Sequence, residues 1–289
     1  MLGPNSYGKS GIRLVRVSRG PDRHDIVDIT VAVSLEGDFE AAHVTGDNSA
    51  VLPTDTMKNT VYAFAAKTLL EPIEGFALAL ARHFVETHAP AERARVEISD
   101  HPWERLDVSG QPHGTAFRRP GGETRVTQAR VERGGEEVVE SGLEGLVLIK
   151  TARSGFAGFA RDRFTTLRET DDRLLATALE AAWTYASADL SFTVLRMGIR
   201  QTLLETFAEH ESRSVQHTLY AMGETVLERY PDVAEIRLSM PNKHHLPVDL
   251  APFGLENRNA IFVATEEPYG LIEAKVRRPS AAERTSRRP

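Results

Sequence analysis

The chain has 289 residues, 41% of them hydrophobic and 26% charged, which is typical of a soluble globular protein with one large domain or two ordinary ones. Its formal net charge of -6 gives no overall positive field for nucleic acid, so we expect no nucleic-acid partner. The chain contains no cysteine, and this excludes disulfides, thiolate nucleophiles and Cys-ligated metal centres.

The first half of the chain shows two strand patterns, two helix patterns and two further strand patterns. Alternating apolar residues predict strands, and apolar residues at helical spacing predict helices. The predicted elements are strands over 12–18 and 24–35, helices over 54–67 and from 72 to near 90, and strands over 94–98 and 125–133.

The second half repeats this order. Its predicted elements are strands over 146–150 and 179–185, helices over 192–207 and 215–230, a strand pair within 236–250, and closing strands over 260–263 and 271–276. The repeat implies an α+β protein with two domains, residues 1–134 and 135–289, each with an antiparallel sheet covered by helices on one face. Uncovered sheet faces and edges favour an oligomer.

The junction Pro241-Asn242-Lys243-His244-His245 connects the two strands predicted within 236–250. An ordinary hairpin would use Asn-Gly or Asp-Gly here, whereas this junction carries an amide, an ammonium and two imidazoles. Such a concentration of polar groups indicates a functional site. In an extended segment Asn242 and His244 would share one face, while Lys243 and His245 would face the other way. Two adjacent histidines cannot then easily bind one metal ion, so we expect no metal site.

Two predicted helices begin with residues suited to binding a ligand. After Pro53, Thr54 or Asp55 is a plausible N-cap, and a helix N-terminus offers free N–H groups and positive potential to an anion. Ser214 is a fair N-cap for the later helix, and Gln216 in its first turn offers an amide to the edge of a heterocycle. Plain helix capping is the alternative interpretation of each start.

A long loop precedes the strand over 179–185 and breaks both periodicities, and such loops are often functional. Its Phe156 either packs in the core or stacks on a planar ligand. Its Arg173 either forms a surface ion pair or grips adjacent carbonyl and nitrogen acceptors. Lys9, before the first strand, indicates by itself no more than a solvated charge.

Taken in order, these short motifs resemble the urate oxidase (uricase) family across essentially the whole chain. Each motif alone is weak, but their number and order are specific. The matching motifs are Tyr7-Gly8-Lys9, the stretch from Thr54 to Tyr62, Phe156-Ala157-Gly158-Phe159, Thr165-Thr166-Leu167, Asp172-Arg173, Ser214-Val215-Gln216, Pro241-Asn242-Lys243-His244-His245 and Pro268-Tyr269-Gly270.

The resemblance implies two tandem tunnelling-fold domains and a barrel that forms when the chains assemble into a homotetramer. It also implies oxidation of urate by O₂ and water to 5-hydroxyisourate and H₂O₂, without a metal or an organic cofactor, at sites on subunit interfaces. By the same resemblance Arg173 and Gln216 would clamp urate, the Val215 backbone would help them, and Phe156 would stack on the urate plane.

The catalytic roles also follow from the resemblance. Lys9, Thr54 and His244 would form a proton relay. Asn242 and Thr54 would hold O₂, and later water, above the ring. Thr54 and Asp55 would come from the neighbouring subunit.

Two other interpretations are open. The chain could be a different tunnelling-fold enzyme, such as a hydrolase of a pterin or of the GTP ring. Those activities generally use zinc with Cys and His ligands, so the absence of cysteine counts against them. It could also be a non-catalytic purine-binding protein, although all residues of the relay are present.

The ends of the chain show no recognisable targeting signal. We see no signal peptide, no apolar run near the ~20 residues of a membrane helix, and no Ser-Lys-Leu terminus. We therefore expect a cytoplasmic protein with no membrane partner. The arginine-rich C-terminus, from about residue 279, is expected to be flexible.

Overall fold

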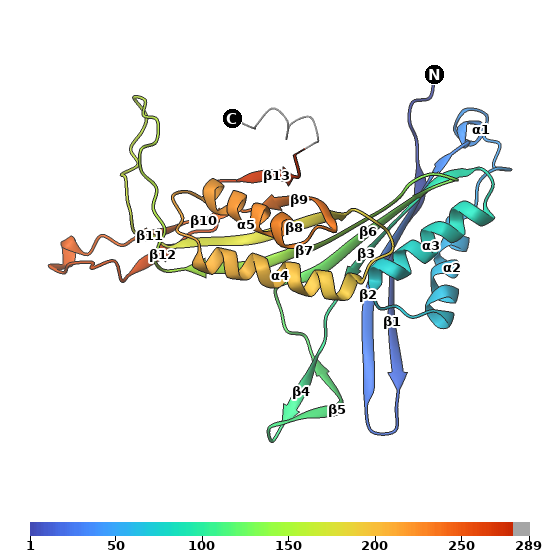
Figure 1. Ribbon diagram of the computed structural model, residues 1–289, viewed down its shortest axis with the longest axis horizontal. Helices are drawn as coiled ribbons and strands as arrows, with labels where there is room; N and C mark the ends of the chain where they lie inside the picture. Colours follow the sequence, from blue (N-terminus) through green and yellow to red (C-terminus); the bar gives the residue numbers. More distant parts are fainter. Residues whose placement is uncertain (280–289) are drawn as a thin grey trace. The chain divides into compact units, whose positions relative to one another are not determined.

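The computed structural model describes residues 1–279, so the tail beyond Pro279 lies outside the described residues. The chain divides into two units, whose elements are labelled in Figure 1. Unit 1 contains Met1–Gly142 and Thr184–Thr193, and unit 2 contains Leu143–Trp183 and the residues from Val194 on. No described helix is both long enough and apolar enough to cross a membrane.

Unit 1 is an antiparallel sheet with helices packed on it. Its elements are β1 (Tyr7–Arg19), β2 (His24–Gly37), α1 (Glu40–Val44), α2 (Thr54–Lys67), α3 (Ile73–Thr87), β3 (Ala91–Asp100), β4 (Glu104–Val108), β5 (Gln111–Arg118), β6 (Thr124–Glu132) and the first part of β7 (Glu137–Lys150). The strands are joined in the order β1, β2, β3, β6 and β7. Helix α3 packs on β3 and β6, and α2 packs on β1.

The core of unit 1 follows from the two periodicities of the sequence. Alternation along β2 places Val31 and Val33 on its buried face. Helical spacing places Phe76, Leu80 and Phe84 on the buried stripe of α3. All five side chains are at most 2% exposed.

A buried ion pair connects α3 to β6. Glu74 is fully buried, and its carboxylate accepts hydrogen bonds from Arg125 Nη2 at 2.6 Å and from the Ser141 hydroxyl at 2.5 Å. Arg125 also donates to the Glu71 carboxylate at 3.0 Å. Charges in such a place are tolerated only while each keeps its partner. The position of α3 on the sheet therefore depends on both members of the pair.

We expect Glu74→Gln to lower the free energy of unfolding by about 3 kcal/mol, because it leaves the buried Arg125 charge with Glu71 alone. The Glu71 side chain is 46% exposed and cannot compensate for the loss. The matched control is Glu137→Gln. Glu137 pairs with Arg82 at a more exposed place than Glu74, so its loss should lower the free energy of unfolding by less than about 1 kcal/mol. Urea unfolding measures both values, and equal losses would contradict the role of the buried pair.

Unit 2 has the same order of main elements. They are the rest of β7, most of β8 (Leu175–Tyr185), α4 (Phe192–Glu209), α5 (Val215–Arg229), β9 (Val233–Ser239), β10 (Asn242–Lys243), β11 (His245–Pro247), the 3₁₀ helix η1 (Ala251–Phe253), β12 (Phe262–Ala264) and β13 (Glu273–Arg277). The sheet order is β7, β8, β9, β13, and β10 pairs with β8. Helix α5 packs on β9 and β13. The predicted tandem α+β architecture is confirmed.

The predicted strand pair within 236–250 is wrong. Its first strand, β9, ends at Ser239, and the next residue, Met240, donates its N–H to Ile272 O at 2.8 Å. The following segments pair elsewhere, because β10 joins β8 and β11 joins β12. The polar junction therefore changes pairing partners instead of turning back on β9.

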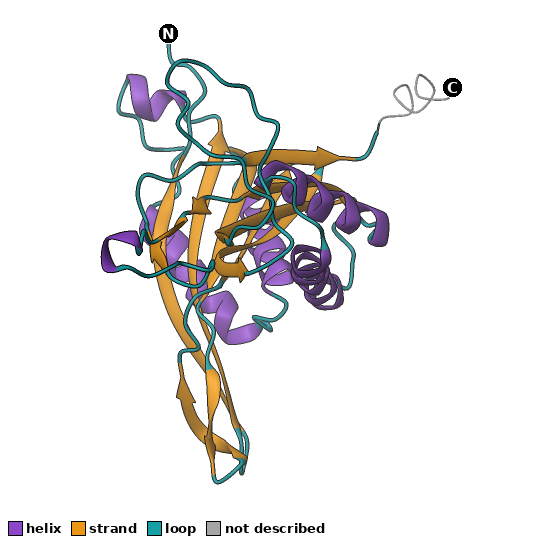
Figure 2. Ribbon diagram, turned by 90° about the vertical axis from the view of Figure 1, so that its left-hand side faces the viewer, coloured by secondary structure: helices purple, strands orange, loops and turns teal. Residues whose placement is uncertain are grey.

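The β4–β5 hairpin and the short helix α1 have no counterpart among the predicted elements. Most residues of the hairpin are exposed on both faces, so it lacks the alternation of a half-buried strand. Arg105 of β4 donates to Gly114 O of β5 at 2.8 Å, and it anchors the hairpin to β2 through a bond to the Asp25 carboxylate at 2.5 Å. Figure 2 shows this end of unit 1 as strands without helix cover.

Candidate active site

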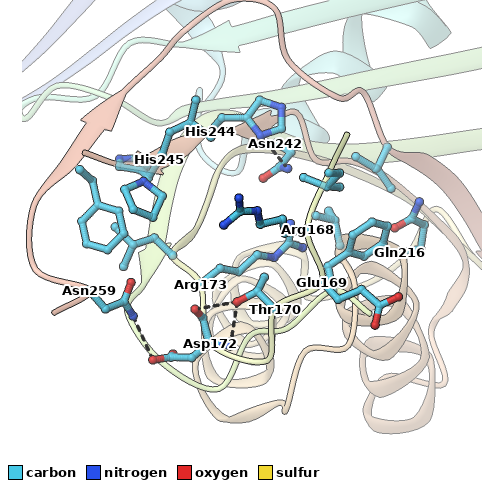
Figure 3. Close-up of a pocket in the computed structure, with 18 residues that line it drawn as sticks. Arg168, Glu169, Thr170, Asp172, Arg173, Gln216, Asn242, His244, His245 and Asn259 are labelled. Atoms are coloured by element: carbon cyan, nitrogen blue, oxygen red, sulfur yellow. Dashed lines mark hydrogen bonds between the residues drawn. The ribbon is translucent and has the colours of Figure 1, made fainter. Parts of the chain in front are cut away.

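A cavity of about 450 Å³ opens in unit 2, a size that suits a small molecule (Figure 3). It is formed by the loop between β7 and β8, by the start of α5, and by the segment from β10 to β12. Several predicted site residues line it together: Phe156, Arg173, Val215, Gln216, Asn242 and His244.

Backbone hydrogen bonds hold the loop that carries Phe156 and Arg173. Phe156 N donates to Thr170 O at 2.6 Å, and Thr170 N donates to Phe156 O at 3.1 Å. Arg173 N donates to Ser154 O at 2.8 Å. The loop is thus folded back on itself, which brings its aromatic ring and its guanidinium to the same cavity.

The Arg173 side chain is partly buried without a carboxylate partner among the described residues. Burial lowers the pKa of Arg173 from its usual value, yet a guanidinium remains charged at neutral pH. Its Nε is buried and makes no hydrogen bond within the described part of the chain. Its Cζ lies 5.3 Å from the centroid of the Phe156 ring. An unsatisfied guanidinium beside an aromatic ring suits a planar anion.

Helix α5 begins at Val215 with Ser214 as its N-cap, which confirms the predicted cap. Ser214 Oγ accepts a hydrogen bond from His217 N at 3.1 Å. Val215 and Gln216 are then the first two helical residues, and their backbone N–H groups have no acceptor within the helix. Together with the Gln216 amide they offer the cavity several donors, an arrangement that favours an anionic ligand.

Asn242 and His244 line the cavity across from Arg173 in Figure 3. Asn242 N donates to Gly270 O at 2.7 Å, and Asn242 Nδ2 lies 3.4 Å from His244 Nδ1. His245 lines the cavity as well, so the prediction that it faces away is wrong. The alternation of a single strand does not hold here because β10 ends at Lys243 and a second strand, β11, begins at His245.

Lys9, Thr54 and Asp55 belong to unit 1, and none of them lines the cavity. Lys9 lies opposite Val33 in the β1–β2 ladder, directly before an irregularity in the register. Tyr7, two residues earlier, accepts a hydrogen bond at its hydroxyl from the backbone just before α2 at 2.8 Å. The start of β1 is therefore tied to the segment that leads into Thr54.

The prediction of Thr54 or Asp55 as an N-cap is wrong. The N-cap position of α2 is Pro53, and no side chain caps the helix. Asp55 lies within the first turn instead, where its carboxylate accepts a hydrogen bond from Lys58 Nζ at 2.5 Å. That bond is the main reason why the pKa of Asp55 falls below its usual value, and the charge of Lys9 adds to the effect.

The cavity wall also contains polar residues that we did not predict as site residues. They include Arg168, Glu169, Asp172 and Asn259. Asp172 belongs to one of the motifs by which the sequence resembles the uricase family, whereas no local pattern marks Asn259. Among the described residues, no group of three or more His, Cys, Asp or Glu side chains could hold a metal ion.

The tandem α+β units define a tunnelling-fold protein, and its donor-rich cavity has a size that suits a small molecule. A family model described as Uricase matches residues 5–130 and 139–273, which is most of the chain. The chain belongs to the uricase family.

Individual relatives agree with this assignment. The chain is 44% identical to the uricase of Arthrobacter globiformis, over 96% of this chain and 90% of that protein. It is 37% identical to the uricase of Dictyostelium discoideum, over 95% and 96% of the two chains. The crystal structure of the Arthrobacter globiformis uricase superposes with a TM-score of 0.93 and covers 97% of this chain and 96% of that one. A urate oxidase structure from Bacillus sp. TB-90 has a TM-score of 0.83 at 26% identity, with 95% and 100% covered.

Proposed function

We propose that this chain oxidises urate with O₂ and water to 5-hydroxyisourate and H₂O₂. The observation that carries the proposal is the unsatisfied guanidinium of Arg173 in a cavity whose other donors come from the start of α5. Urate is a flat anion with carbonyl and ring-nitrogen acceptors side by side along its edge. A guanidinium fork and a row of N–H groups are the complement of such an edge.

Each of these cavity residues makes a different contact with urate. Arg173 and Gln216 clamp the acceptor edge of urate, and the Val215 backbone N–H adds a third donor. Phe156 stacks on the plane of urate, and the centroid of its ring lies 5.3 Å from Arg173 Cζ, beside the guanidinium that clamps the urate edge. These groups stabilise the further deprotonated form of urate, and the extra negative charge of that form makes removal of electrons from the ring easier.

The reaction itself needs proton transfer and a place for O₂. Lys9, Thr54 and His244 form the proposed relay, which removes a proton from urate and returns protons to the reduced oxygen. Asn242 and Thr54 hold O₂ and then water. Two electrons leave urate and reduce O₂ to H₂O₂, and water adds a hydroxyl at the oxidised carbon, so urate, O₂ and water balance 5-hydroxyisourate and H₂O₂.

We further propose that the working form is a homotetramer whose sites lie at subunit interfaces, so that a neighbouring subunit supplies Lys9, Thr54 and Asp55. Two observations support this. None of the three residues lines the cavity of unit 2. Unit 2 also exposes large apolar side chains such as Phe253 and Leu255, at 73% and 61%, which a partner would bury.

The proposed reaction needs no metal and no organic cofactor, since the anionic substrate is itself the reductant. We also propose a cytoplasmic location, because a chain without cysteine suits a reducing compartment.

The test is turnover by the purified, metal-stripped protein. Given urate and air, it should consume urate, seen as loss of the urate absorbance, and release peroxide, seen with a peroxidase-coupled dye. Readdition of metal should not change the rate. A folded tetramer that releases no peroxide would refute the proposed function, and urate binding without turnover would support the alternative of a purine-binding protein.

A further inference from the structure

One hydrogen bond joins two walls of the cavity that come from distant parts of the chain. Asn259 Nδ2 donates to Asp172 Oδ2 at 3.0 Å, across 87 positions of sequence. Both residues line the cavity, and Figure 3 shows the bond at its rim beside Arg173. Asp172 directly precedes Arg173, and Asn259 belongs to the segment that begins at His244.

That segment, residues 244–265, is weakly held by packing. Its base is closed by the bond from Thr265 N to His244 O at 2.9 Å. Between these points Leu246, Ile261 and Val263 are 53%, 53% and 51% exposed. Few of its own side chains therefore fix how far it lies from the Arg173 loop.

The segment nevertheless presents Asn259 in a defined way. The Asn257 side chain donates to Val248 O at 2.8 Å and to Ile261 O at 2.7 Å, and its oxygen accepts from Ala260 N at 3.0 Å. Within this turn Asn259 has φ of 58°, a left-handed conformation that asparagine adopts more readily than most residues. The turn thus aims the Asn259 amide away from itself and toward the other wall.

The acceptor side is equally defined. Asp172 N donates to Thr170 Oγ1 at 3.3 Å, and that hydroxyl donates back to Asp172 O at 3.1 Å. The next residue, Arg173, is fixed by its N–H bond to Ser154 O at 2.8 Å. Because Asp172 directly precedes Arg173 in the chain, a shift of Asp172 would strain this bond and move the guanidinium that the proposed function places on the substrate.

We propose that Asn259 and Asp172 are positioning residues whose hydrogen bond sets the width of the cavity between Arg173 and His244. The proposal rests on the proposed urate oxidation and deepens it, because neither residue needs to touch the substrate. The bond is exposed to solvent, so it contributes little to the stability of the fold. Loss of the bond should instead weaken substrate binding, seen as a higher KM for urate.

The test compares variants by steady-state kinetics with urate. Asn259→Asp replaces the hydrogen bond with two facing carboxylates, and aspartate still tolerates the left-handed backbone conformation. This variant should raise the KM for urate on the order of fivefold and keep kcat within about twofold of wild type. Adding Asp172→Asn restores a donor and an acceptor with the roles reversed, and the double variant should return to near the wild-type KM. The midpoint of thermal unfolding should stay the same throughout.

A charge control separates positioning from simple repulsion of an anionic substrate. Asn259→Asp combined with Glu169→Gln has the same net charge as the double variant above and removes a carboxylate from the same wall, but it leaves Asp172 facing Asp at 259. Its KM should stay raised relative to Glu169→Gln alone. Equal rescue by Glu169→Gln and Asp172→Asn would overturn the proposal, and so would an unchanged KM in Asn259→Asp.

Amide hydrogen exchange tests the positioning role of the bond without a measurement of turnover. Amides of residues 255–263 should exchange faster in Asn259→Asp than in wild type and should recover in the double variant with Asp172→Asn. If wild type does not oxidise urate, the proposed function fails, while the exchange comparison still decides whether the bond holds the segment. Unchanged exchange in Asn259→Asp would overturn the positioning role.

Discussion

Arg173→Gln should lower kcat/KM for urate by about a thousandfold, because it removes two charge-assisted hydrogen bonds that together contribute on the order of 4 kcal/mol. The guanidinium has an unsatisfied, buried Nε and no carboxylate partner among the described residues, so its interactions await a ligand. Most of the loss should fall on binding. Anaerobic titration with urate measures that binding separately from turnover.

Two further variants sharpen the Arg173 test. Arg173→Lys keeps the charge but loses the planar fork, and it should still lose most of the affinity. Arg163→Gln is the matched control, since this arginine lies in the same loop, stacks at 4.5 Å on Phe164 and does not line the cavity. It should keep kcat/KM within about twofold of wild type. Urate affinity that survives Arg173→Gln would contradict the clamp.

Lys9→Met should lower kcat by about a hundredfold or more, while KM changes little. The reason is that Lys9 is proposed to move protons and does not line the cavity of unit 2. Lys243→Ala is the control: it removes the same charge from the residue next to His244, and Lys243 does not line the cavity either. Its effect should be mild. A Lys9→Met protein with normal kcat would refute the relay.

Mixing two inactive variants tests whether a site is shared between subunits. Chains with Lys9→Met keep Arg173, and chains with Arg173→Gln keep Lys9. If each site takes Lys9 from one subunit and Arg173 from its neighbour, co-expressed chains should regain roughly a quarter of the wild-type activity by random assembly. Chains purified separately and assayed side by side are the control. No recovery in verified mixed oligomers would show that each chain supplies both residues itself.

The regular elements could be predicted because local periodicity determines them. Met57 and Val61 of α2 are fully buried, as are Val31 of β2 and Val226 of α5, and all lie on the apolar stripes that the sequence displays. Ser214 could be predicted as an N-cap because capping depends on one side chain and its own helix. The β4–β5 hairpin could not, since its residues are exposed on both faces and follow no pattern.

Which residues line the candidate cavity could be predicted in part, from other signals than periodicity. Asn242 and His244 were predicted because their polar junction interrupts two apolar stretches, although β8, which pairs with β10, lies far away in sequence. Arg173 and Phe156 were weak candidates until the order of motifs was considered. The Asn259–Asp172 bond could not be found at all, because it joins two exposed polar residues 87 positions apart.

The stoichiometry of oxygen uptake tests the central claim most directly. In a closed oxygen-electrode cell, the purified protein should consume one O₂ for each urate lost, and catalase should return half of that oxygen by decomposing the H₂O₂ formed. This outcome identifies O₂ as the two-electron acceptor for a urate that supplies its own electrons. Urate loss without oxygen uptake, or oxygen uptake that catalase leaves unchanged, would contradict the account.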